Sequence, residues 1–76
     1  MITDEKLIEM KYRPKVKAGE KLYVGCISDR KDLAPRQYLS IPARNKNEAT
    51  AFAHEYALRL LGLEKNSYLV ILGLES

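Results

Sequence analysis

The middle of the chain carries the residue types that bind anionic partners, lysine and arginine, with tyrosines between them. Residues 11–46 hold a net charge of +7, whereas residues 1–10 and 47–76 each hold −2, and the whole chain has +3. Cations neutralise phosphates, and phenol rings offer a flat surface on which unpaired bases stack. The predicted contact residues for a partner are Lys11, Arg13, Lys15, Lys17, Tyr23, Arg30, Lys31, Arg36, Tyr38 and Arg44.

Two classes of partner fit these residues. Direct binding of nucleic acid requires cations and tyrosines on one exposed surface, where Tyr23 and Tyr38 are expected. A protein or ribonucleoprotein partner would use the same basic surface, with aromatic side chains as anchors. Tyrosines also occur on exposed strand faces because of their conformational preference alone. The pattern therefore favours a binding module and leaves both partners open.

The residues that catalysis or metal binding needs are few and scattered. His54 is the only histidine, and no nucleophile-elbow motif surrounds Ser28 or Asp29. Cys26, the only cysteine, is expected at an inward strand position, where a thiol behaves as a small hydrophobe. One cysteine and one histidine do not make the usual zinc site, and no glycine-rich phosphate loop is present. The sequence predicts no enzyme, no cofactor and no metal.

Length and composition predict a single domain over residues 1–76. Of these 76 residues 46% are hydrophobic and 30% are charged, as in a small globular domain. The longest apolar run, residues 69–74, is far shorter than a membrane span. No secretory signal pattern is visible, and a single cysteine suits a reducing compartment, so we expect a cytoplasmic protein.

Hydropathy patterns predict four strands and one helix. Alternating apolar and polar residues, typical of half-buried strands, cover residues 8–12, 21–28 and 36–42, and a dense run of strand-forming residues covers 68–74. Before the last strand, Asn45 and Glu48 have capping-box spacing, and Gly62 can end the helix in the left-handed conformation. The apolar stripe of this helix comprises Ala49, Phe52, Ala53, Tyr56 and Leu60.

The order β-β-β-α-β predicts an α+β fold, a small four-stranded and mainly antiparallel sheet with one helix packed on one face. The third and fourth strands would be parallel through a right-handed crossover if they are neighbours. The predicted helix side comprises Ile8, Met10, Tyr12, Leu22, Val24, Cys26, Leu39 and Ile41. The predicted open face comprises Glu9, Lys11, Arg13, Lys21, Tyr23, Arg36 and Tyr38.

The last strand is apolar on both faces. Leu69 and Ile71 are as apolar as Val70 and Leu72, so both sets of side chains favour burial. Either this strand is central in the sheet, or its second face meets another chain, as in a homodimer formed through it. Coverage by another part of the same chain is the alternative within a monomer.

Three groups of small proteins resemble parts of this sequence. The strand 37–41 followed by the helix opening at Asn45 resembles the arm-type and AP2-like DNA-binding domains, which contact DNA with a sheet. The order of elements, with residues 23–27 on the second strand, is similar to the HicB-type antitoxin fold. Residues 67–73 resemble the closing strand of a family of phage-encoded anti-CRISPR proteins. The last resemblance implies binding to a CRISPR effector complex.

Together these observations predict a small non-enzymatic inhibitor or regulator. It would engage a protein or nucleoprotein complex, in the manner of an anti-CRISPR, through a basic surface of the sheet and its loops. Direct nucleic-acid binding through the same residues is the alternative, and no membrane contact is expected.

Overall fold

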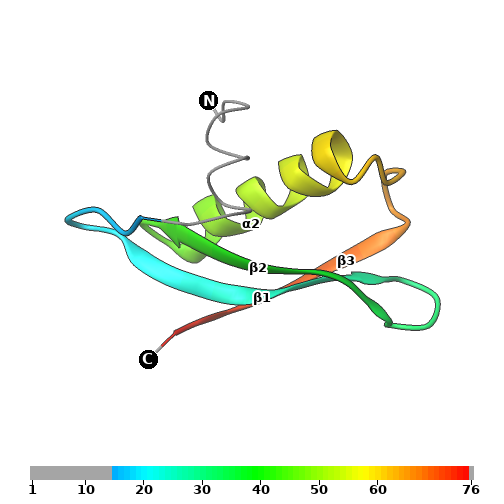
Figure 1. The fold of residues 1–76 in the computed structure, drawn as a ribbon, viewed down its shortest axis with the longest axis horizontal. Helices are drawn as coiled ribbons and strands as arrows, with labels where there is room; N and C mark the ends of the chain where they lie inside the picture. Colours follow the sequence, from blue (N-terminus) through cyan, green and yellow to red (C-terminus); the bar gives the residue numbers. More distant parts are fainter. Residues whose placement is uncertain (1–14, 76) are drawn as a thin grey trace.

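The computed structural model describes residues 15–75, which form one sheet with a helix across one of its faces (Figure 1). The sheet contains β1 (Lys21–Asp29), β2 (Pro35–Ala43) and β3 (Tyr68–Leu74). The helix consists of α2 (Lys46–Glu55) and continues without a break into the π-helical turn η1 (Tyr56–Leu60). The α+β class and the packing of one helix on one sheet face are confirmed. The strand predicted over 8–12 lies outside the described residues.

The strands are arranged in the order β2-β1-β3, and both pairs are antiparallel. Tyr23 of β1 lies opposite Ile41 of β2 and Leu74 of β3. Because β1 separates β2 from β3, the two strands joined by the helix are not neighbours, and the condition for a parallel pair is not met. In the described sheet β3 is therefore an edge strand and not a central one.

The two faces of β1 are opposite to those predicted. Tyr23 and Ile27 face the helix, with exposed fractions of 7% and 0%, and Leu22, Val24 and Cys26 take the other face. The expectation that Tyr23 lies on the open face is thus wrong, as is the inward position of Cys26. In this strand both alternating sets are largely apolar, so the period of two does not distinguish the faces. The inward positions of Leu39 and Ile41 and the outward position of Tyr38 in β2 are confirmed.

The helix begins as the sequence predicts. The Asn45 side chain accepts a hydrogen bond of 2.8 Å from the backbone N–H of Glu48, which satisfies one of the free donors of the first turn. At the other end Gly62 has a φ of +66°, the left-handed conformation that favours glycine. The predicted termination at this residue is confirmed.

The apolar stripe of the helix changes at its last turn. The backbone N–H of Leu61 donates to the Tyr56 carbonyl, five residues back, which widens the turn. This shift buries Ala57 and leaves Leu60 41% exposed, so the predicted inward position of Leu60 is wrong. The earlier stripe residues Ala49, Phe52, Ala53 and Tyr56 are buried as predicted, against Tyr23, Ile27, Leu39, Ile41, Tyr68 and Leu72 of the sheet.

Candidate functional site

The sheet face opposite the helix is mostly apolar, and its central positions among the described residues carry no charge. Its register places Cys26 between Tyr38 of β2 and Ile71 of β3, and Val24 between Ser40 and Gly73. We call these residues, together with Leu22 and Leu69, the open sheet face. Figure 1 shows the helix on the opposite side only, and within residues 15–75 no helix or strand packs against this face.

Two side chains project most from the open sheet face. Tyr38 is 72% exposed and Ile71 is 52% exposed, whereas Leu22, Val24, Cys26 and Leu69 are half-buried. The Cys26 thiol and the Ser28 hydroxyl form a hydrogen bond of 3.2 Å, so the polar groups of this face are partly satisfied within it. A contiguous apolar surface with one prominent aromatic ring is typical of protein contact sites.

The described basic residues gather toward the two ends of the sheet, away from the central positions of its open face. One cluster, which we call the proximal end, surrounds the start of β1 and the end of β2 and contains Lys15, Lys17, Lys21, Arg44 and Lys46. The other, the hairpin end, contains Arg30, Lys31 and Arg36 around the β1–β2 turn and Lys65 in the loop before β3. The structure thus separates the basic members of the predicted contact set that it describes into two groups. Lys11 and Arg13 lie outside the described residues.

At the hairpin end an ion pair fixes the turn. Asp29 Oδ2 accepts a hydrogen bond of 2.8 Å from Arg36 Nη2, and Asp29 Oδ1 accepts one of 2.8 Å from the backbone N–H of Lys31. The guanidinium of Arg36 and this backbone N–H lower the pKa of Asp29 below its ordinary value of 3.8. Half of the Arg36 side chain is exposed, so solvent and salt weaken the pair.

Replacing Asp29 with asparagine is expected to remove a small pH-dependent part of the stability. Asparagine keeps an oxygen for the Lys31 N–H but carries no charge for Arg36. The wild-type carboxylate stabilises the fold above pH 3.8, and this contribution disappears as the pH falls through the lowered pKa. In urea unfolding, the difference between wild type and Asp29→Asn should shrink as the pH falls from neutral to below 3.8. Arg36→Gln should reproduce this trend, and a difference that does not change with pH would contradict it.

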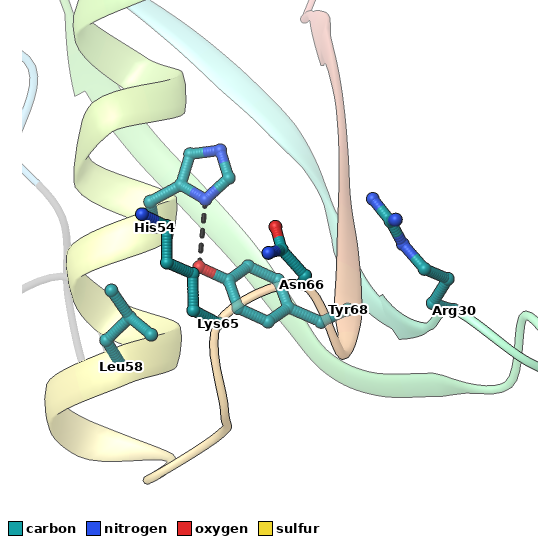
Figure 2. Close-up of a pocket in the computed structure, with 6 residues that line it drawn as sticks. All are labelled: Arg30, His54, Leu58, Lys65, Asn66 and Tyr68. Carbon is teal, nitrogen blue, oxygen red and sulfur yellow. Dashed lines mark hydrogen bonds between the residues drawn. The ribbon is translucent and has the colours of Figure 1, made fainter.

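A pocket of about 250 Å³ lies beside the hairpin end, between the helix and the loop that precedes β3 (Figure 2). The Tyr68 hydroxyl and His54 Nδ1 form a hydrogen bond of 2.9 Å across it. Burial and the nearby Glu55 carboxylate raise the pKa of Tyr68, so its hydroxyl stays protonated at neutral pH. The pocket is lined by Arg30, His54, Leu58, Lys65, Asn66 and Tyr68.

Of the residues that line this pocket, Arg30 alone was predicted from the sequence as a partner-contact residue, and the pocket itself was not predicted. His54 is exposed on the helix, as expected, but its contact with Tyr68 joins residues 14 positions apart, and no local pattern signals such a contact. Lys65 and Asn66 lie in a loop, where the positive φ of Asn66 shapes the turn. Asparagine is one of the few residues that favour this conformation, which is the only signal that the sequence provides.

Residues 15–75 lack a metal-binding group of side chains and a membrane-spanning helix. No group of three or more histidine, cysteine, aspartate or glutamate side chains in this part of the chain is arranged to hold a metal ion. Nor does the same part contain a helix with the length and apolar character needed to cross a membrane.

Comparisons with known proteins provide no family for this chain. No protein-family model matches it, and searches of curated proteins and of solved structures found no similar protein. The resemblances to anti-CRISPR, antitoxin and DNA-binding domains stay predictions.

Proposed function

We propose that this chain is a non-enzymatic binding module, an inhibitor or regulator, whose open sheet face docks on a protein partner. The observation that carries this proposal is the uncharged apolar surface around Cys26, with Tyr38 and Ile71 projecting from it. Water contact with such a surface is unfavourable, and a protein partner that covers it gains the free energy of burying it. Tyr38 is the aromatic anchor of this interface.

A protein suits this face better than a nucleic acid. Stacking of bases would need aromatic rings, but Tyr23 is buried under the helix, and Tyr38 is the one tyrosine of the described strands that projects from the open face. Phosphates would need cations beside the bases, and the cations lie at the two ends of the sheet. Direct nucleic-acid binding is therefore the second choice.

The charge at the ends of the sheet indicates what kind of protein fits. Both ends have more basic than acidic side chains among the described residues. Two copies stacked through their open faces would bring basic ends together in either relative orientation, which is unfavourable. A partner with an apolar patch flanked by carboxylates would match both the open sheet face and the basic ends of the sheet. Such a partner can be one subunit of a nucleoprotein complex, as the anti-CRISPR resemblance implies.

Replacement of Ile71 with lysine tests this proposal. Ile71 is half exposed, so the variant should fold, and a charge on the proposed interface, directly opposite Cys26, should weaken partner binding by about tenfold or more. Leu60→Lys is the matched control, because it adds the same charge at a 41% exposed leucine of the helix. The wild type, Ile71→Lys and Leu60→Lys are each immobilised and used to capture partners from cell extract. The captured protein is then purified and titrated calorimetrically against the wild type and both variants.

Three outcomes would overturn the proposal. The first is that the purified partner binds Ile71→Lys as tightly as it binds Leu60→Lys. Sedimentation would show a wild-type dimer that Ile71→Lys dissociates, which would assign the face to a second copy. Labelled oligonucleotides would bind below micromolar concentration with a steep salt dependence that Ile71→Lys leaves intact, which would support the nucleic-acid alternative.

A further inference from the structure

The outer edge of β3 carries a row of backbone groups that bond to nothing within residues 15–75. Just before β3, the Ser67 carbonyl accepts a hydrogen bond of 3.1 Å from β1, and just after it the Glu75 N–H donates one of 2.9 Å to β1. The register between them has no shift, so every second residue from 67 to 75 bonds to β1. The N–H and carbonyl groups of the residues between them point to the free edge, and these residues are Tyr68, Val70, Leu72 and Leu74.

The opposite edge of the sheet, formed by β2, is protected against a further strand. By the same alternation, the outward backbone groups of β2 belong to Arg36, Tyr38, Ser40 and Pro42. Pro42 has no N–H, and the Tyr38 carbonyl already accepts a hydrogen bond of 3.1 Å from the Gln37 side chain. Proline, charge and occupied backbone groups are the means by which proteins prevent unwanted pairing at an edge.

None of this protection is present on β3. Its seven residues include no proline and no charged side chain, and its pairing with β1 has no bulge. Ile71 and Leu74 are 52% and 53% exposed on opposite faces of the sheet, and Val70 is half-buried. A strand added beside β3 would therefore satisfy the free backbone groups and also cover apolar side chains on both faces.

We infer that the edge of β3 binds an extended segment of the protein partner, which adds a fourth strand to the sheet. This inference rests on the proposed function and names how the partner binds. Donors and acceptors that repeat about every 7 Å along a strand match another extended backbone. Ile71 belongs both to β3 and to the open sheet face, so a partner on that face lies directly beside the edge.

Charge indicates the composition of the segment. Its central residues are uncharged, because those of β3 are uncharged, and its flanks carry carboxylates, because both ends of the sheet have more basic than acidic side chains. Antiparallel pairing of two copies of β3 would place the hairpin end of one copy beside the proximal end of the other. Both ends are basic, so a second copy is a less favourable occupant than an acidic-flanked segment.

A synthetic peptide of alternating valine and threonine, with aspartates at both ends and blocked termini, tests the ligand class. In NMR titration of the full chain it should shift the amide signals of Val70 and Leu72 and slow their hydrogen exchange by about tenfold or more. The signals of Arg36 and Ser40 at the β2 edge should not change. A control peptide with N-methyl groups on two adjacent central residues cannot pair through either edge and should bind at least about fivefold more weakly.

The peptides can also overturn the inference. No change at Val70 and Leu72 up to millimolar peptide, or equal effects of the two peptides, would show that β3 does not accept a strand. Tighter binding of a peptide with lysines in place of the aspartates would overturn the assignment of acidic flanks.

Paired variants at Val70 test the backbone contact. Val70→Pro removes an outward N–H without breaking a bond to β1, whereas Val70→Thr keeps the N–H and nearly the same shape. Val70→Pro should weaken peptide binding by about tenfold or more, and Val70→Thr by less than about twofold. Leu74→Pro repeats the test at a half-exposed position near the end of β3, where the fold tolerates proline best. Equal affinities of the proline and threonine variants would overturn the inference.

Other occupants of the edge are detected without peptide. Slow exchange of Val70 and Leu72 in a monomer would assign the edge to another part of this chain, and a dimer that Val70→Pro dissociates would assign it to a second copy. Either result overturns the inference. If Ile71→Lys loses the purified partner and Val70→Pro retains it, the edge inference fails and the proposed function stands. If Ile71→Lys retains the partner, the proposed function fails, whatever the peptide does.

Discussion

Replacement of Gly25 with alanine is expected to lower the free energy of unfolding by about 3 kcal/mol, the upper part of the range for inserting a methyl group into a packed interior. Gly25 lies in the middle of β1, between both neighbouring strands. A Cβ there would lie 2.8 Å from the carbonyl carbon of Ile71 and 2.9 Å from the Cα of Leu72, and closer still to the Ile71 carbonyl oxygen. These are backbone atoms of β3, so no side-chain rotation can relieve the clash.

Gly73→Ala is the matched control for this prediction. Gly73 belongs to the same strand pair, opposite Val24, and a Cβ there would meet no heavy atom within 4 Å. Its substitution should change the stability by less than about 0.5 kcal/mol. Urea unfolding followed by far-ultraviolet circular dichroism measures both variants. Equal losses would show that β1 and β3 do not approach each other at Gly25 as the structure describes.

Ile27→Ala is the second substitution with a large expected effect, a loss of about 3 kcal/mol. Ile27 is completely buried between the sheet and the helix, and truncation to alanine leaves a cavity that the surrounding residues fill only partly. Val24→Ala, on the half-buried open face of the same strand, should cost about 1 kcal/mol or less.

This pair of variants separates the two possible orientations of β1. In the opposite orientation, with Leu22, Val24 and Cys26 facing the helix, Val24→Ala would be the more destabilising substitution. Thermal and urea unfolding of both variants decide between the orientations, because a difference of about 2 kcal/mol shifts the midpoint of a domain of this size by about 8–16 °C. A larger loss for Val24→Ala would contradict the burial of Ile27.

Local signals in the sequence predicted most of the elements. The capping interaction of Asn45 with Glu48 and the left-handed Gly62 depend on residues close in the chain, and both are present. The strand over 68–74 was predicted with its observed bounds, and β1 and β2 each extend one residue beyond the prediction at one or both ends. Such features follow from backbone preferences and short-range hydrogen bonds, which do not need the rest of the fold.

The positions of the candidate contact residues were predicted less well than the helix and the strands. The sequence predicted one basic surface, formed by the sheet and its loops and including Tyr23, whereas the structure divides the basic side chains between the two ends of the sheet and buries Tyr23. The contact of His54 with Tyr68 brings together a helix and a strand that are joined by a loop. Residues far apart in the chain meet only through the packing of α2 on the sheet, and periodicity carries no information about such meetings.

By itself, the sequence determined a small α+β fold, the position of its helix and the strongly basic character of residues 11–46. Only the tertiary structure decided which face of β1 is covered, that β3 lies at the edge of the sheet formed by residues 15–75, and that Arg30 and Lys65 line the same pocket. The physical reason lies in the apolar residues of β1 and β3, which occupy both faces of these strands. When both faces are apolar, hydropathy favours neither, and the covered face is the one on which the side chains of the helix fit together with those of all three strands.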